Sequence, residues 1–403
     1  MKSAAIILAL TMLAAVPTAP RIQPLPDTQW TDVHRELVRT YARDEAVPND
    51  LRTLLVYPEL VKDLMPFERY ISTESTLSPR HREILILRTA WLCRSGYEWA
   101  RHAGIAKKAG LKDDDLKRIA RGPDERGWDP FEKALVQVAD ELHVSSFVSD
   151  ATWAVLTARY NTQEAIDAVF TVAEFTMISG MVNSLGVQIE PGAADRLPAD
   201  VAYRVTAVKN DERLIGKKAR VAPIDPADWT PDVRKWLDPN GSGRSVAAIY
   251  RTYAHHLKMD IPRTAVSEHI RQRSTLSPVI RELLIMRIGW LCRSEYEWAA
   301  HAPAGRRAGM SEADVQHVIA GPGSGADAST DALLRAVDEL YHDDVISEAT
   351  WSALASRLDA KQLLDVLTTI GGYRMVSMAL NTLGVQLEPG AVRFPVSASG
   401  GTP

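Results

Sequence analysis

The chain of 403 residues has only two cysteines, and its charged residues nearly balance, with 47 Lys and Arg against 51 Asp and Glu. Two cysteines exclude a fold held together by several disulfides, so a hydrophobic core must stabilise the protein. The formal net charge of -4 gives no basic surface of the kind that binds nucleic acid, and no run of Lys and Arg lies among aromatic residues. We therefore expect no nucleic-acid partner.

Several motifs with well-understood chemistry are also absent. The sequence has no C-x-x-C pair, no glycine-rich phosphate loop, no nucleophile elbow and no dinucleotide fingerprint. No stretch alternates between apolar and polar residues over a useful strand length, whereas helical spacing recurs throughout. With 46% hydrophobic and 24% charged residues, the composition is that of an ordinary globular protein. The expected fold class is therefore all-α.

The N-terminus differs from the rest of the chain. Lys2 is followed by an apolar run, residues 4–16, and by small residues and prolines up to Pro20. This order is typical of a secretory signal, and the run is too short to span a bilayer. We expect residues 1–20 to be a signal peptide and the protein to be secreted or periplasmic, with a cytoplasmic protein bearing an N-terminal extension as the alternative. No other segment looks long and apolar enough to span, so no stable membrane insertion is expected.

The feature that organises the chain is a duplication. Residues 77–111, LSPRHREILILRTAWLCRSGYEWARHAGIAKKAGL, recur as residues 276–310, LSPVIRELLIMRIGWLCRSEYEWAAHAPAGRRAGM, with 21 of 35 positions identical. Such a repeat predicts two similar domains in tandem. We place the first domain at 21–192, a linker at 193–224, the second domain at 225–392 and a disordered tail at 393–403.

Polar residues recur within this repeat at matching positions. Apolar residues in a duplicated core can replace one another, as Ile84 and Leu283 do, so identity concentrated in ionisable residues indicates chemistry rather than packing. We expect the functional site here. The recurring residues are Glu83, Arg88, Cys93, Arg94, Ser95, Tyr97, Glu98, Trp99 and His102, which reappear as Glu282, Arg287, Cys292, Arg293, Ser294, Tyr296, Glu297, Trp298 and His301.

Glu98 and His102 are four residues apart, so they lie on one face of one helix. A carboxylate beside an imidazole fixes its tautomer and raises its proton affinity, as a general acid or base near neutral pH requires. Glu83 lies on the preceding helix and could complete a three-residue proton relay. If the two helices simply fold back at Ser95, however, Glu83 falls about one turn beyond His102. The second copy offers the same set as His301, Glu297 and Glu282.

Other interpretations of these residues stay open. Ser95 and Glu98 also spell the S-x-x-E capping box, in which the glutamate returns to the amide of its own cap. Glu83 could serve only the helix dipole, and His102 could be a structural histidine. A metal would need Glu83 as third ligand, without any supporting ligand motif, so we expect none. Cys93 and Cys292 are expected to be small buried residues, without excluding a redox role.

A substrate pocket is expected around the histidine. Tyr97 and Trp99 are candidates for its wall, and Arg88 or Arg94 could hold an anionic substrate. The corresponding candidates in the second copy are Tyr296, Trp298, Arg287 and Arg293. The two pockets need not be alike, because Gly104 becomes Pro303, which is expected to kink the second helix just after His301.

The repeat resembles the carboxymuconolactone decarboxylase and alkylhydroperoxidase D-like family in three features. These are the early glutamate, the helix cap about twelve residues later, and the motif Y-E-W-x-x-H before A-x-x-A-G. The resemblance covers residues 26–192 and 225–390. It implies tandem all-helical domains and assembly, since members of the family usually form trimers or hexamers. A trimer of tandem chains forming a pseudo-hexamer is therefore the expected homo-oligomer.

The resemblance also separates two branches. The peroxidase branch uses C-x-x-C-x-x-x-H with an upstream glutamate; here His102 and Glu83 match, but the thiols are replaced by Ser95 and Glu98, and by Ser294 and Glu297 in the second copy. Without them the thiol cycle cannot run. The decarboxylase branch has a glutamate four residues before the histidine and acts on carboxylate-bearing lactones by proton transfer, without a cofactor.

We therefore expect a cofactor-independent lyase or isomerase acting on a small organic acid or lactone. His102 is the expected proton-transfer residue, with Glu98 and Glu83 as its partners. The first alternative is an alkylhydroperoxidase-like antioxidant enzyme that lacks the C-x-x-C. The second is a non-catalytic binding or structural protein.

Overall fold

The computed structural model describes residues 15–42, 46–198, 201–203, 205 and 218–395. Within these ranges every regular element is a helix and no strand occurs, so the all-α prediction is confirmed. The expected signal peptide and the expected C-terminal tail lie largely outside the described residues, as does part of the linker.

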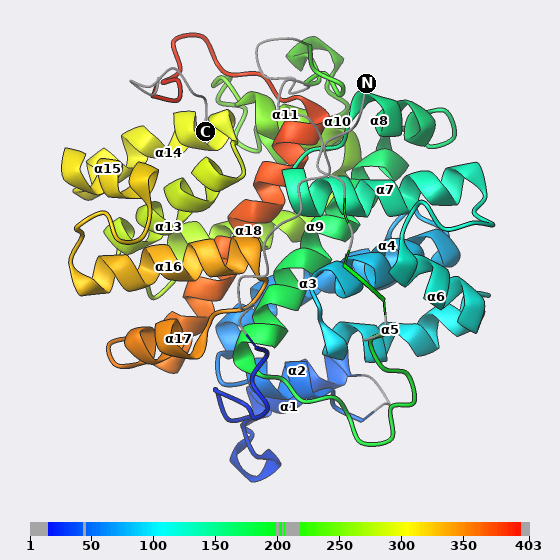
Figure 1. Cartoon of the computed structure of the whole chain (residues 1–403). Coiled ribbons are helices and arrows are strands. Elements are labelled where there is room, and N and C mark those ends of the chain that lie inside the picture. The colour runs from blue at the N-terminus through cyan, green and yellow to red at the C-terminus, as the bar shows by residue number, and fades with distance from the viewer. Residues whose placement is uncertain (1–14, 43–45, 199–200, 204, 206–217, 396–403) are drawn as a thin grey trace, which may run out of the picture.

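The helices of the first half recur in the same order in the second half, as Figure 1 shows. The helices of the first half are α1 (Asp32–Tyr41), α2 (Asn49–Leu54), α3 (Pro58–Arg69), α4 (Pro79–Leu92), α5 (Gly96–Lys108), α6 (Asp113–Arg121), α7 (Pro130–Ser145), α8 (Asp150–Thr157) and α9 (Thr162–Leu185). Their counterparts are α10 (Pro231–Leu237), α11 (Ala248–Tyr253), α12 (Leu257–Glu268), α13 (Pro278–Leu291), α14 (Glu295–Ala308), α15 (Glu312–Ala320), α16 (Ala328–His342), α17 (Glu348–Ala355) and α18 (Ala360–Leu383).

Local sequence explains where the helices of the repeat begin and end. The Ser78 hydroxyl accepts a hydrogen bond from the His81 amide at 3.3 Å, and Pro79 occupies the first turn of α4. Gly309 ends α14 at a φ of 106°, a conformation that favours glycine. Pro303 does not end α14, which continues to Ala308. The helix boundaries were thus largely readable from the sequence.

Two long helices, α9 and α18, form the centre of the molecule and pack against each other (Figure 1). Nearly every residue of both helices is buried. By length and composition α9 is apolar enough to cross a membrane, so the expectation that no such segment follows the N-terminus was wrong. Its apolar stretch is completely buried inside the protein, as a central core helix requires.

The two halves are tied together where the chain enters each of them. The Arg21 amide donates to the Leu185 carbonyl at 2.8 Å, and its guanidinium donates to the Ile346 carbonyl of the second half at 2.7 Å. Arg220 repeats this arrangement, because its guanidinium donates to the Val148 carbonyl of the first half at 2.7 Å. The halves therefore share hydrogen bonds in both directions and form one packed body.

Candidate active site

The turn between α4 and α5 brings the repeated polar residues together. α4 ends at Leu92, and Arg94 adopts a left-handed conformation with a φ of 52°. The Ser95 amide then donates to the Ala90 carbonyl at 2.8 Å. This turn folds α5 back along α4, so residues early in α4 face residues late in α5. The second half has the same turn, with Arg293 at a φ of 53°.

His102 lies between two carboxylates. Its Nδ1 is 2.9 Å from Glu83 Oε2, and its Nε2 is 3.7 Å from Glu98 Oε2. The exposed fractions are 0% for Glu83, 2% for Glu98 and 3% for His102, so all three groups are enclosed by protein. The structure thus brings Glu83 within hydrogen-bond distance, although a simple fold-back of the helices leaves it one turn away.

The second half repeats this geometry with slightly shorter distances. His301 Nδ1 is 2.7 Å from Glu282 Oε2, and His301 Nε2 is 3.3 Å from Glu297 Oε2. Each half therefore contains a Glu-His-Glu cluster built by two helices, α4 with α5 and α13 with α14.

The capping-box interpretation of Glu98 does not hold for its side chain. The Ser95 hydroxyl does accept from the Glu98 amide, at 3.4 Å, so Ser95 caps α5. The Glu98 carboxylate, however, faces His102, and the Ser95 amide is used by the Ala90 carbonyl. The glutamate is thus available for a role other than capping.

Burial and neighbouring charges shift the titration of these groups. Burial raises the pKa of Glu98 to about 7, and the charge of Asp50 adds to this rise while that of His102 opposes it. For His102, burial lowers the pKa, but the charge and hydrogen bond of Glu83 outweigh it, and the pKa is raised above its ordinary value. Burial also raises the pKa of Glu297. The Glu98 carboxyl therefore titrates near neutral pH.

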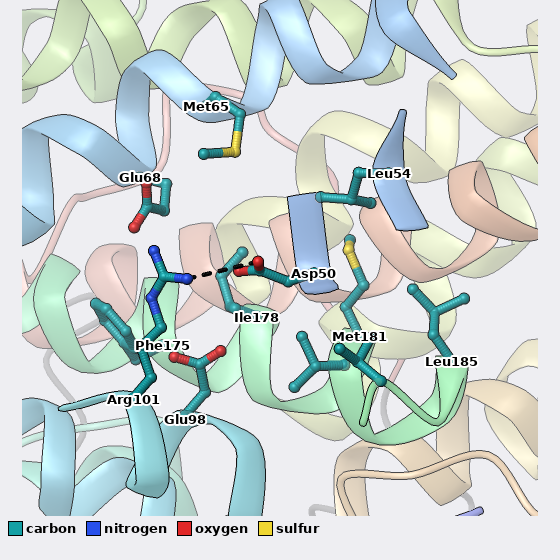
Figure 2. A pocket seen from close by; sticks show the side chains of 12 residues that line it. Asp50, Leu54, Met65, Glu68, Glu98, Arg101, Phe175, Ile178, Met181 and Leu185 are labelled. Carbon is teal, nitrogen blue, oxygen red and sulfur yellow. Dashed lines mark ion pairs between the residues drawn. The ribbon is translucent and has the colours of Figure 1, made fainter. Parts of the chain in front are cut away.

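Glu98 forms part of the wall of a narrow pocket, shown in Figure 2. The pocket has room for about one water molecule as it stands. Oε1 of Glu98 is buried and has no hydrogen-bond partner among the described residues. The lining residues are Asp50, Leu54, Met65, Glu68, Glu98, Arg101, Phe175, Ile178, Met181, Val182, Leu185 and Val187.

His102 is not among these lining residues and lies behind Glu98, with its ring edge-on to Phe175 at 4.9 Å between centroids. The pocket thus presents a carboxyl group, and the imidazole supports it from inside the protein. This arrangement differs from the expectation that the histidine itself meets the substrate.

Arg101 is a pocket residue that the sequence did not reveal. Its Nη1 lies 3.5 Å from Asp50 Oδ1, and Figure 2 shows the guanidinium between Asp50 and Glu68. The charge of Asp50 raises the pKa of Arg101 further above its ordinary value. The second copy has Ala300 at this position, so a search for residues shared by the two repeats passes over it.

The arginines that the sequence suggested as substrate ligands serve other purposes. Arg88 is fully buried, its Nε lies 2.5 Å from Asp140 Oδ1, and its Nη1 donates to the Ala120 carbonyl at 2.7 Å. Arg287 is held in the same way, with Nη2 at 2.6 Å from Asp338 Oδ2. Both guanidinium groups are already occupied by protein partners, so the expectation that they bind a substrate was wrong.

Arg94 and Arg293 occupy the turn between the two helices of each cluster. The Arg94 guanidinium lies over the Tyr203 ring, 5.1 Å from its centroid, and Arg94 is absent from the lining of the pocket beside Glu98. Burial lowers the pKa of Arg293. Both residues adopt a left-handed conformation in these turns, which is uncommon for arginine, so the turn alone does not explain why arginine recurs.

The aromatic residues expected in the pocket wall mostly pack elsewhere. The Tyr97 hydroxyl lies 2.8 Å from Glu190 Oε1 and 3.0 Å from Asp50 Oδ1, and neither Tyr97 nor Trp99 is among the lining residues. Trp99 is 2% exposed and belongs to the core. Tyr97 therefore acts on the pocket only indirectly, by holding Asp50.

Their counterparts in the second half have similar places. Trp298 packs against Trp290 and Phe394, with ring centroids 5.4 Å and 5.6 Å away. The Tyr296 hydroxyl accepts from the Ile249 amide at 3.4 Å. These contacts position the helices of the second half.

Sequence reasoning also missed a buried cluster between the halves. Cys93 Sγ lies 3.8 Å from His143 Nδ1, and His143 Nε2 lies 3.6 Å from Asp344 Oδ2. Three groups of this kind could ligate a metal ion. Arg374, however, places Nη1 2.7 Å from the Asp344 carboxylate and neutralises it. Burial lowers the pKa of His143 to about 4 and raises that of Cys93. Arg374 Nη2 also donates to the His143 carbonyl at 3.4 Å, so the cluster is best described as a buried polar contact between the halves.

Comparison with known proteins agrees with the duplication. Residues 58–141 and 262–339 match the carboxymuconolactone decarboxylase family, and each segment contains one Glu-His-Glu cluster. Among solved structures the chain is similar to an alkylhydroperoxidase AhpD core, an uncharacterized peroxidase-related protein from Ralstonia eutropha JMP134. The two are 19% identical, the match covers 42% of this chain and 92% of that chain, and the TM-score is 0.37. No curated protein matches. Each half of the chain therefore contains one segment that matches the carboxymuconolactone decarboxylase family.

Proposed function

We propose that the protein is a cofactor-independent acid/base enzyme, a lyase or an isomerase, that moves a proton on a small organic acid or lactone. One observation carries this proposal: the Glu98 carboxyl lines a pocket, has a pKa raised to about 7 by burial, and has one oxygen without a hydrogen-bond partner among the described residues. A group that titrates near the working pH is effective both as base and as acid.

Glu98, His102 and Glu83 have different roles in the proposed reaction. Ionised Glu98 takes a proton from a carbon next to the substrate carbonyl, and the electron pair of that C–H bond moves toward the carbonyl oxygen. Protonated Glu98 then returns the proton. His102 is held through Nδ1 by Glu83 at 2.9 Å, which raises the pKa of the imidazole, and the positive charge of protonated His102 stabilises the ionised form of Glu98. Glu98 is thus the catalytic residue, and His102 and Glu83 position it and tune its charge.

The thiol alternative has less support from the geometry. The Cys93 thiol lies near His143 and not in the Glu-His-Glu cluster, and burial raises its pKa, which keeps it protonated and weakly nucleophilic. A purely structural cluster is also disfavoured, because buried polar atoms in structural networks are normally satisfied. Within the described part of the chain, Glu98 Oε1 and Glu83 Oε1 have no hydrogen-bond partner, although Arg82 Nε lies 3.7 Å from Glu83 Oε1 as an ion pair.

The proposal is tested by the exchange of carbon-bound protons. In deuterated buffer, proton NMR would follow the exchange of protons next to the carbonyl in δ-valerolactone and in levulinate. We expect the intact protein to accelerate exchange in at least one probe, and the double variant Glu98→Gln, Glu297→Gln to lose about 100-fold or more of that acceleration. The single variants Glu98→Gln and Glu297→Gln show how much of the activity each half contributes. A double variant that exchanges as fast as the unmodified protein would refute the proposal.

A further inference from the structure

Resting on the proposed function, we infer that the first-half site takes an uncharged, largely apolar carbonyl compound such as a lactone without a carboxylate, and that its reaction is a proton-shift isomerisation. The inference comes from the charges and apolar surfaces that the pocket offers.

The pocket has no cation that is free to receive a carboxylate. Among its described lining residues, Arg101 alone carries positive charge, and its guanidinium is paired with Asp50 at 3.5 Å. Figure 2 shows Glu68 on the other side of the same guanidinium. The remaining ionisable lining residue is Glu98. Carboxyl groups therefore outnumber cationic groups by three to one in this lining.

The pocket lining disfavours an anionic substrate in either protonation state of these acids. If Glu68 and Glu98 are ionised, the pocket is negative and repels an anion. If they are protonated, they offer neutral hydrogen-bond donors, which suit a carbonyl oxygen. Glu174 adds a further carboxyl group near the pocket. It is fully buried on α9, one turn before Ile178, and neither of its carboxylate oxygens has a hydrogen-bond partner among the described residues. Burial raises the pKa of Glu174, and the charge of Glu68, another acid, raises it further.

The rest of the pocket is apolar. One face comes from α9, with Phe175, Ile178 and Met181 among its contacts, and the opposite side includes Leu54 and Met65. Such a wall favours the burial of carbon and gives no compensation for the loss of water around a charge. A lactone is larger than the free space, which holds about one water molecule, so the lining side chains must move apart to admit it. The bound substrate then presents one carbonyl to the acid groups and hydrocarbon to the remainder.

This substrate class decides between the two reactions. Decarboxylation breaks the bond between a carbon and its carboxylate, leaves the electron pair on that carbon and releases carbon dioxide, so it needs a carboxylated substrate. A proton shift needs none. In an unsaturated lactone, Glu98 removes a proton next to the carbonyl, the double bond moves as the electron pair spreads into the enolate, and the same proton is returned two carbons away. Atoms and electrons balance without any co-reactant.

The test uses two probes that differ only at one ring substituent. γ-Valerolactone carries a methyl group where 5-oxotetrahydrofuran-2-carboxylate carries a carboxylate. Binding to the full chain at pH 8 would be measured by saturation-transfer NMR titration, which needs no turnover. We expect γ-valerolactone to bind at least tenfold more tightly. Equal or tighter binding of the carboxylate by the unmodified protein would overturn the inference, and so would the failure of both probes to bind.

Two variants test the cause of the selectivity. Asp50→Asn removes the partner of Arg101 and keeps a side chain of similar shape, so it should strengthen carboxylate binding several-fold. The double variant Asp50→Asn, Arg101→Met should lose this gain. Glu68→Gln provides a second route to the same gain if Asp50→Asn does not fold. Unchanged carboxylate binding in both Asp50→Asn and Glu68→Gln would contradict the charge argument. Selective binding together with absent proton exchange would reject the proposed function and leave the selectivity standing.

Discussion

At the scale of single residues, the structure assigns the two members of the E-x-x-x-H pair to different places. Their spacing of four put both on one helix face, which the sequence could show. Glu98 lines the pocket and His102 lies behind it against Phe175. Whether Glu98 or His102 faces the pocket depends on how α9 packs against α5. The sequence of the repeat holds no information about that packing.

The titration of Glu98 follows from its surroundings. Burial raises its pKa to about 7, and the positive charge of His102 lowers it. We therefore expect His102→Gln to raise the pKa of Glu98 further. Because the pKa in the folded protein lies above the ordinary value of 4.5, the protonated carboxyl stabilises the fold below pH 4.5, and this contribution is lost as the pH rises through about 7.

Two arginines show what residue patterns could and could not predict. Arg88 recurs in both halves because the core needs it, as its bonds to Asp140 and to the Ala120 carbonyl show. Recurrence of an ionisable residue therefore did not distinguish a buried ion pair from a ligand. Arg101 lines the pocket and does not recur, since Ala300 replaces it. A pocket that differs between the halves cannot be found from what the halves share.

At the scale of elements, the sequence predicted the helices well because caps and stops are local. Ser78 with Pro79 began α4 as expected, and the Gly309 stop ended α14. The turn at Arg94 could not be predicted in the same way. Its left-handed conformation in a non-glycine residue is what brings Glu83 opposite His102, and this conformation is uncommon for arginine.

α4 is buried on nearly all sides, so its polar residues require internal partners. We expect Arg88→Met to destabilise the protein by about 3–5 kcal/mol, because it leaves the buried Asp140 carboxylate unpaired. Gly122, with a φ of 94°, lies against the same guanidinium, because a Cβ added there would come within 3.0 Å of Arg88 Nη2. Urea unfolding followed by circular dichroism measures the effect.

The matched control is Arg101→Met. This arginine is half-buried at the pocket and pairs with Asp50 at 3.5 Å, so its removal should cost about 1 kcal/mol or less. If Arg88→Met unfolds at the same urea concentration as Arg101→Met, the structural role given to Arg88 is wrong.

At the scale of the whole molecule, the duplication predicted two similar halves but not how they meet. His269 illustrates this contact: its Nδ1 lies 2.9 Å from Asp63 of the first half, and its Nε2 lies 2.8 Å from Asp365 of the second half. The equivalent position in the first half is Tyr70, which bonds Asp167. Contacts between segments that are far apart in the chain differ between the halves, so the repeat pattern could not reveal them.

This contact makes the joint between the halves sensitive to pH. Burial lowers the pKa of His269, but the hydrogen bonds and charges of Asp365 and Asp63 outweigh it and raise the pKa above 6.5. The stabilisation is thus fully present below pH 6.5 and is lost as the pH rises through the pKa of the folded protein. We expect His269→Gln to lower the melting temperature more at pH 5.5 than at pH 9.

Differential scanning fluorimetry across this pH range measures the difference. Asp63→Asn removes one of the two carboxylates, so in that background the effect of His269→Gln on the melting temperature should differ less between the two pH values. A His269→Gln penalty that is the same at both pH values would show that the charge of His269 does not hold the halves together. Assembly into a trimer of tandem chains stays a prediction that does not depend on this contact.

The central claim is that Glu98 is an acid/base group poised at neutral pH on the wall of a pocket. Carbon-13 NMR titration of the glutamate carboxyls, with Glu98→Gln used to assign the resonance, tests it most directly. We predict a Glu98 pKa of about 7 in the unmodified protein and a higher one in His102→Gln. A Glu98 pKa at the ordinary value of 4.5 that does not respond to His102→Gln would show that Glu98 is not such a group.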